Sequence, residues 1–140
     1  MSGVTADRLA DTFTAARSGG RSHDAIDIIA PQGTPVLAAV DGEIIKFFDS
    51  VPGGITIYQL SEDKRYIYYY AHLQRRADGL QPGGIVKQGT TIGYVGDTGN
   101  AGPGNYHLHF SIARTTDPKR YWEGTYLNPY PYLKSGSAPE

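Results

Sequence analysis

The chain has 140 residues and a formal net charge of −1, and 39% of its residues are hydrophobic. A chain of this size and composition can bury a core of its own, which excludes an intrinsically disordered protein. The chain has no cluster of Lys and Arg typical of nucleic-acid binding, and without Cys it has no disulfide, thiolate metal ligand or thiol nucleophile.

The N-terminal segment, residues 1–20, is predicted to hold a short helix over residues 5–16. Leu9, Phe13 and Ala16 recur at a spacing that places them on one helical face, and a Gly- and Ser-rich loop follows. No apolar run in the chain is long enough to span a membrane. The N-terminus also lacks the basic stretch followed by an apolar one that marks a signal peptide. We therefore expect neither a membrane span nor a signal peptide in this chain.

The remainder of the chain has the pattern of short strands separated by Gly- and Pro-containing turns. Strands are predicted at residues 26–29, 36–40, 43–48, 55–60, 65–72, 92–95 and 107–113. Asp41-Gly42 predicts a tight hairpin between the second and third of them, and the fourth and fifth are expected to pair. These elements predict a mainly β, compact antiparallel domain over residues 21–134, followed by a frayed tail at residues 135–140.

The four histidines of the chain stand at predicted strand ends or beside Gly-rich loops: His23, His72, His107 and His109. His107 and His109 alternate with Leu108 in a predicted strand, so both imidazoles are expected on one face of the sheet. Two imidazoles on a rigid strand form half of a metal site. Surface histidines with no function explain this pair equally well.

A carboxylate and two further histidines extend this pattern. His23 and Asp27 are four residues apart, and Asp27 interrupts an apolar run in which a carboxylate must be paired, metal-bound or solvent-facing. Strand alternation predicts that His72 shares a face with Tyr68 and Tyr70. Taken singly, each residue is explained by packing or solvent exposure. Together, two imidazoles, a carboxylate and an open coordination position are typical of a catalytic zinc site. Nitrogen ligands bind zinc in preference to calcium or magnesium.

Three sequence motifs carry a resemblance to a known family. The first is H-D-A-I-D-I-I-A-P-Q-G-T-P-V, which starts at His23; the second is Y-A-H-L at residues 70–73; the third is G-Y-V-G-D-T-G-N followed by H-L-H-F. In order and spacing they resemble the lysostaphin-type peptidoglycan zinc metalloendopeptidases. Two departures from the family pattern are visible. Ala25 replaces the usual Gly of the first motif, and an enlarged loop at residues 101–104 precedes the His-x-His of the third motif.

The resemblance implies the duplicated hybrid motif, a barrel-sandwich hybrid with long loops around a metal cleft. It implies that His23, Asp27 and His109 hold one Zn²⁺ per chain, and that His72 and His107 are the two catalytic histidines that do not bind the metal. All five residues are present, which argues against an inactive relative. The implied activity is hydrolysis of cross-link or stem peptides of bacterial peptidoglycan by a metal-activated water, in an extracytoplasmic compartment.

The sequence leaves the division of work between the two catalytic histidines open. His107 is favoured as the general base because it lies one strand step from His109. Tyr106, Tyr70 and Asn100 are candidates for contact with a peptide substrate, although ordinary loop packing is the favoured role for each of them. We expect a monomer that acts on a peptidoglycan peptide and has no nucleic-acid partner.

Other functions compete with this interpretation. One alternative is a zinc-binding regulator or scaffold of cell-wall hydrolysis with little turnover of its own, and another is a protease that acts on Gly-rich proteins. A third is a lipoyl- or biotinyl-type carrier domain. Such a domain needs an exposed Lys at a hairpin tip, and the predicted Asp41-Gly42 tip has none.

Overall fold

The computed structural model describes residues 26–50, 53–101, 103–104, 106–115 and 125–127. Within these residues the strands are β1 (Ile26–Ile29), β2 (Pro35–Leu37), β3 (Gly42–Ser50), β4 (Gly54–Ser61), β5 (Tyr66–Arg76), β6 (Ile85–Val86), β7 (Thr91–Val95), β8 (His107–Arg114) and β9 (Thr125–Leu127), and a 3-10 turn, η2, spans Gly99–Ala101. The predicted helix at residues 5–16, the predicted tail at residues 135–140 and His23 lie outside the described residues. No helix in the described part of the chain has the length and apolar character that crossing a bilayer requires.

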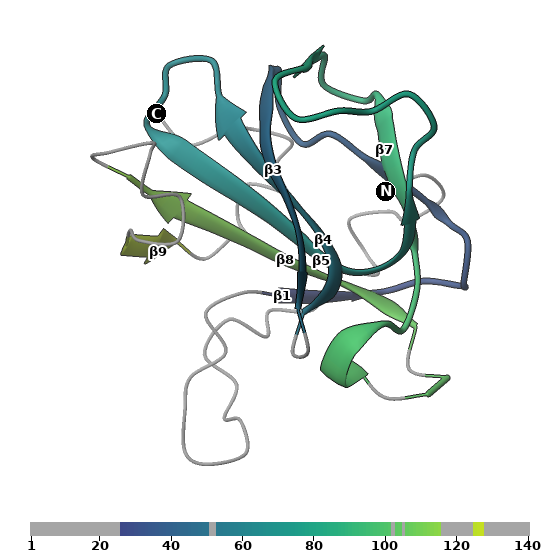
Figure 1. Ribbon diagram of the computed structural model, residues 1–140. Helices are drawn as coiled ribbons and strands as arrows, with labels where there is room; N and C mark the ends of the chain where they lie inside the picture. Colours follow the sequence, from purple (N-terminus) through teal and green to yellow (C-terminus); the bar gives the residue numbers. More distant parts are fainter. Residues whose placement is uncertain (1–25, 51–52, 102, 105, 116–124, 128–140) are drawn as a thin grey trace.

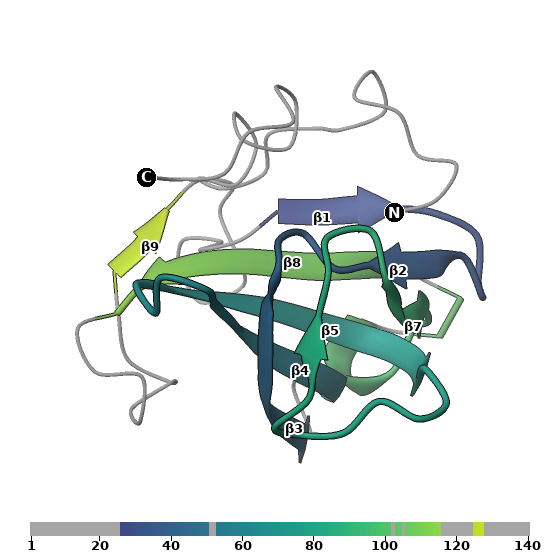
Figure 2. The same cartoon turned by 90° about the horizontal axis from the view of Figure 1, so that it is seen from above.

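The strands form one sheet whose pairs are all antiparallel, which confirms the predicted mainly β architecture. Its main path is β1-β8-β5-β4-β3-β6, while β9 pairs with β8, and β7 joins β2 to β5. β5 and β8 run side by side through the middle of the molecule (Figure 1). β1 lies along β8 in the view from above (Figure 2).

The hydrophobic core lies between the strands of the main path and the β2–β7 pair of the same sheet. Leu108 and Phe110 of β8 pack there with Tyr70 of β5, and Val36 and Ile92 close the core from β2 and β7. Burial of each large apolar side chain contributes about 1.5–3 kcal/mol. Because a slip of one residue would turn these side chains to solvent, the core fixes the register of β1, β5 and β8. The alternate residues of the same strands are thereby placed on the outer face.

The predicted hairpin at Asp41-Gly42 is wrong. β2 pairs with β7, whereas β3 pairs with β4 and β6, so the two strands flanking this dipeptide are not partners. A carboxylate oxygen of Asp41 instead accepts a hydrogen bond from the backbone N–H of Gln88 at 2.6 Å, and Gly42 is in close contact with the backbone of Leu60. The local turn signal does not decide the pairing, because β2 pairs with β7 and buries Val36 there and therefore does not pair with β3.

β5 changes partners at His72. Residues 66–71 pair with β8, and residues 73–76 pair with β7, while β4 follows β5 on its other edge. The register of both the β4 and β7 pairings is shifted in this region. His72 has a φ of 61°, a left-handed conformation that costs a residue with a side chain roughly 1–2 kcal/mol. Such a residue persists only where the surrounding structure determines it, and functional sites are where this is most often seen.

Candidate metal centre

β1 and β8 bring a carboxylate and two imidazoles together on the outer face of the sheet. Asp27 is the register partner of His109, and Ile29 is the partner of His107. Oδ1 of Asp27 is shielded from solvent and lies 3.4 Å from Nδ1 of His109 and 3.7 Å from Nε2 of His107. The prediction that His107 and His109 share a face, opposite to Leu108, is confirmed.

His72 joins this cluster from β5. Its ring centroid lies 5.0 Å from that of His107 and 5.6 Å from that of His109. Tyr68 and Tyr70 are buried in the core on the opposite side of the strand. The prediction that His72 shares their face is therefore wrong. The reason is the left-handed backbone at His72, which interrupts the alternation of β5 and turns the imidazole toward the two histidines of β8.

The environment of His72 keeps its imidazole uncharged. Burial lowers the pKa of His72 to about 4, against the opposing effect of its hydrogen bond to Thr98, and the neighbouring His107 and His109 lower it further. Removing an imidazole from water penalises its cationic form. At neutral pH, His72 is therefore a neutral imidazole, the form that a proton acceptor requires.

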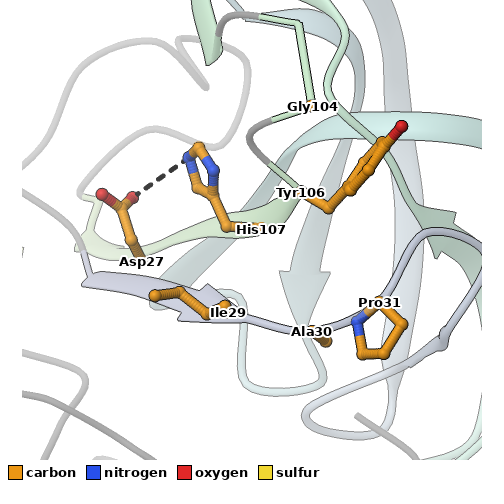
Figure 3. A pocket seen from close by; sticks show the side chains of 7 residues that line it. All are labelled: Asp27, Ile29, Ala30, Pro31, Gly104, Tyr106 and His107. Atoms are coloured by element: carbon orange, nitrogen blue, oxygen red, sulfur yellow. Dashed lines mark ion pairs between the residues drawn. The ribbon is translucent and has the colours of Figure 1, made fainter.

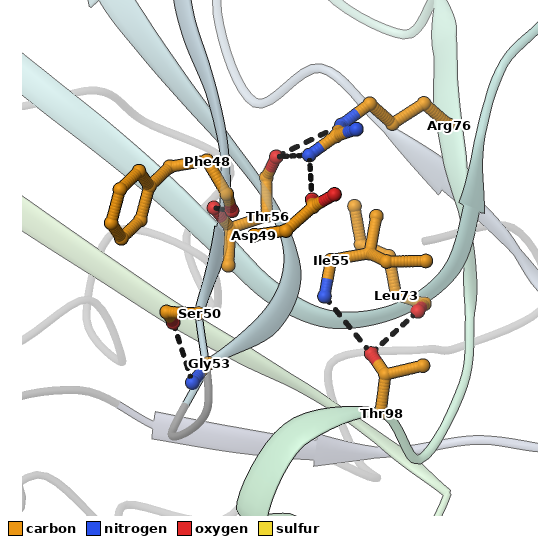
Figure 4. A network of polar contacts seen from close by, with 9 residues as sticks. All are labelled: Phe48, Asp49, Ser50, Gly53, Ile55, Thr56, Leu73, Arg76 and Thr98. Carbon is orange, nitrogen blue, oxygen red and sulfur yellow. Dashed lines mark hydrogen bonds and ion pairs between the residues drawn. The ribbon is translucent and has the colours of Figure 1, made fainter.

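The residue before β4 and the Gly-rich segment between β7 and β8 hold His72 in place. The backbone N–H of His72 donates to the carbonyl of Gly53 at 2.9 Å, and its ring Nδ1 is 2.7 Å from the carbonyl oxygen of Thr98. The hydroxyl of Thr98 donates to the carbonyl of Leu73 at 2.7 Å and accepts from the N–H of Ile55 at 3.1 Å (Figure 4). The sequence alone did not single out Thr98, although it lies in the third motif.

Two tyrosines of β5 take different positions relative to the site. Tyr70, a candidate substrate contact from the sequence, is buried, and its hydroxyl donates to the side-chain oxygen of Gln59 at 2.7 Å. Tyr69 faces the site instead, with its ring centroid 6.0 Å from that of His109. The signal that could have found Tyr69 is its alternation with Ala71, the register partner of His109.

An open pocket of about 520 Å³ adjoins the cluster (Figure 3). It is lined by Asp27, Ile29, Ala30, Pro31, Gly104, Tyr106 and His107. Asp27 and His107 meet at one side of the pocket, and the rest of its lining is largely apolar (Figure 3). Ile29 is 78% exposed although it is a large aliphatic residue in a strand. Tyr106, a candidate substrate contact from the sequence, lies on this wall.

The described residues supply part of a ligand set that fits zinc. Among them, no three His, Cys, Asp or Glu side chains form a complete metal-binding group, and His23 lies outside them. Asp27 and His109 nevertheless offer one carboxylate and one imidazole from two directly paired strands, with a carboxylate oxygen and a ring nitrogen 3.4 Å apart. Nitrogen and oxygen donors of this kind, with a third ligand and an open position, are the set that catalytic zinc requires.

Comparison with known proteins shows the same fold and related sequences. Residues 21–129 match the family described as "Peptidase family M23". The "Peptidoglycan DD-endopeptidase ShyC" of Vibrio cholerae is 42% identical over 93 residues, which are 66% of this chain and 20% of that protein. The "L-Ala--D-Glu endopeptidase" of Bacillus subtilis is 32% identical over 122 residues, 84% of this chain and 36% of that protein. The chain thus spans only a minor part of both relatives.

Among solved structures, the catalytic domain of the antimicrobial peptidase lysostaphin from Staphylococcus simulans superposes with a TM-score of 0.76 at 27% identity. The match covers 92% of this chain and 95% of that domain. Sequence and fold agree with the resemblance that the three motifs carry. The chain therefore belongs to peptidase family M23 and has the lysostaphin-like catalytic fold.

Proposed function

We propose that this chain is a zinc metalloendopeptidase that hydrolyses peptide bonds in the cross-links or stem peptides of bacterial peptidoglycan. The observation that carries the proposal is the position of Asp27, whose shielded Oδ1 lies within 3.7 Å of His107 and 3.4 Å of His109. The names of the relatives from Vibrio cholerae and Bacillus subtilis support an endopeptidase. Since peptidoglycan lies outside the cytoplasm, we place the site of action there.

In this proposal His23, Asp27 and His109 hold one zinc ion. A zinc ion held there would lower the pKa of a water molecule to near 7 and polarise the carbonyl of the scissile bond. The protein's part is to keep the ligands fixed. Asp27 and His109 stand on paired strands whose other faces are buried in the core, so the backbone at either residue cannot move without disturbing that packing.

The two other histidines move protons at the reaction centre. Hydrolysis forms a bond from the water oxygen to the carbonyl carbon, breaks the bond from carbon to nitrogen, and transfers a proton to the leaving amine. His107 stands beside Asp27, and His72 stands beside His107 at a ring distance of 5.0 Å. In this proposal both rings lie close enough to the metal ligands to reach the reacting water and the leaving amine. His72 is uncharged at neutral pH, so one of its ring nitrogens has the lone pair that a proton acceptor requires.

The proposed activity is tested with purified peptidoglycan. The protein should solubilise it and release new amino groups. Chelation should abolish release, zinc should restore it, and elemental analysis should find about one zinc per chain. Mass spectrometry of the products identifies the bond cut. Zinc binding without release would indicate a regulator or scaffold, and cleavage of Gly-rich proteins but not of peptidoglycan would indicate the other alternative.

The open pocket beside His107 is proposed to hold an uncharged part of the substrate peptide. Ile29 lines this pocket and is 78% exposed in the absence of substrate, and Ile29→Ser removes its aliphatic side chain. Loss of this apolar contact is expected to cost about 1 kcal/mol of binding, which raises KM about 5-fold and leaves kcat nearly unchanged. The measurement is steady-state hydrolysis of a soluble cross-linked peptide.

Ile85→Ser is the matched control for the pocket. Ile85 is 69% exposed, and it lies on β6 at the opposite end of the sheet's main path. Ile85→Ser should therefore leave KM unchanged. Equal effects of the two substitutions, or no effect of Ile29→Ser, would remove the pocket from the substrate site.

A further inference from the structure

We propose that Thr98 is a positioning residue, which fixes the imidazole of His72 as the tautomer protonated on Nδ1 and thereby leaves Nε2 to accept a proton at the reaction centre. The proposal deepens the proposed function and rests on it. Thr98 touches none of the reacting groups in this scheme and acts through His72 alone. Three hydrogen bonds of Thr98 carry the argument: its hydroxyl donates one and accepts one, and its carbonyl accepts one.

The tautomer follows from the chemistry of the carbonyl. A carbonyl oxygen can only accept a hydrogen bond, so at 2.7 Å from the oxygen of Thr98, Nδ1 of His72 must carry the hydrogen. A neutral imidazole has one N–H, and its other nitrogen then has a lone pair. In a neutral ring held in this way, Nε2 is the acceptor. Sequence reasoning favoured His107 as the base, and the orientation of His72 gives it an accepting role of its own.

The hydroxyl of Thr98 fixes the position of this carbonyl. It donates to the carbonyl of Leu73 on β5 and accepts from the N–H of Ile55 on β4, so one side chain joins two paired strands (Figure 4). Leu73 is the residue after His72. The hydroxyl and the carbonyl of Thr98 thus hold two consecutive residues of β5, at the point where the strand changes partners.

The backbone around Thr98 leaves little room for movement. Gly54 has a φ of +70°, and a Cβ at this position would come within 2.5 Å of the carbonyl carbon of Thr98. Gly96 is packed equally closely, since a Cβ there would lie 2.7 Å from Cα of Gln74. The segment carrying Thr98 is therefore in backbone contact with β4 and β5. Its carbonyl is held rigidly enough to choose the tautomer of the histidine it faces.

Thr98→Val tests the role of the hydroxyl, because valine keeps the shape of threonine and removes both hydroxyl hydrogen bonds. We expect kcat to fall on the order of 10-fold, as for other partners that orient a functional histidine, with KM and zinc content unchanged. Thr98→Ser keeps the hydroxyl and should restore kcat. Rescue by serine would not be expected if only the packing of the side chain mattered.

Thr56→Val is the matched control. The hydroxyl of Thr56 is fully buried on β4 and donates to the carbonyl of Phe48 (Figure 4). Its loss leaves a buried group without its hydrogen bond, so the free energy of unfolding should fall by an amount comparable to that of Thr98→Val. Thr56→Val should leave kcat at the wild-type value. An equal fall of kcat in both variants would overturn the proposal, because it would mark a general effect of destabilisation.

Nitrogen NMR of the histidine rings provides a readout that does not depend on activity. In the zinc-loaded protein, ¹⁵N–¹H long-range correlations should assign His72 to the Nδ1–H tautomer in wild type, Thr98→Ser and Thr56→Val. In Thr98→Val they should shift toward a mixture of tautomers. An Nε2–H tautomer in wild type would overturn the proposal even if Thr98→Val fails to fold. Wild-type protein with the expected tautomer but without peptidoglycan hydrolysis would instead overturn the proposed function and leave the positioning of His72 standing.

Discussion

Asp27→Asn is expected to yield folded protein that retains no stoichiometric zinc and hydrolyses peptidoglycan at less than about 1% of the wild-type rate. The substitution keeps the size of the side chain and removes its charge. Loss of a residue that only orients a metal ligand typically lowers metal affinity or activity about 10–100-fold. Loss of a carboxylate that binds the metal directly should lower them further. Zinc content after dialysis and the rate of amino-group release are the two measurements.

Asp78→Asn controls for the change of charge. Asp78 is fully exposed and lies 3.5 Å from a guanidinium nitrogen of Arg75, so its neutralisation should change neither zinc content nor rate. Circular dichroism should show the same fold for both variants. If Asp27→Asn retained one zinc per chain, Asp27 would not be a ligand, and the assignment of the site to β1 and β8 would fail.

Gly54→Ala is expected to destabilise the fold by about 2–5 kcal/mol and to reduce activity with it. Gly54 has a φ of +70°, where a residue with a Cβ is strained by about 1–2 kcal/mol. The new Cβ would also lie 2.5 Å from the carbonyl carbon of Thr98 and 2.6 Å from the nitrogen of Gly99. Forcing apart such contacts costs typically about 1–3 kcal/mol. Urea unfolding of the zinc-free protein measures the difference.

Gly79→Ala separates the two causes. Gly79 has a φ of +82°, and a Cβ there meets nothing within 4 Å. The strain of a left-handed alanine should therefore appear alone, as about 1–2 kcal/mol, with activity unchanged. Equal destabilisation by the two substitutions would mean that the segment carrying Thr98 yields to the added methyl group, and that its contact with Gly54 is not rigid.

Strand alternation predicted much of the site, because it depends only on which face of a strand is buried. Leu108 and Phe110 mark the inner face of β8, and this alone places His107 and His109 together on the outer face. Asp27 follows in the same way from its buried neighbour Ile28. The family resemblance added the roles of these residues, which alternation cannot supply.

Features that depend on contacts distant in sequence were not predictable. The face of His72 could not be read from alternation, because its left-handed backbone arises where β5 leaves β8 for β7. The turn signal at Asp41-Gly42 gave the wrong pairing because the partner of β2 is β7, far along the chain. Thr98 has no sequence signal of its own, since its role comes from hydrogen bonds to β4 and β5.

β5 is bonded to β4 along one edge and to β8 and then β7 along the other, and this arrangement bears on how the protein loses its structure. Freeing His72 requires the separation of β5 from partners that all belong to the same core. Many enzymes carry catalytic groups on segments that open locally at little free energy. Here the backbone amides of His72 and Ile55 should exchange with solvent only through cooperative, global opening. With zinc kept in excess, heat should therefore end catalysis and melt the sheet in one transition.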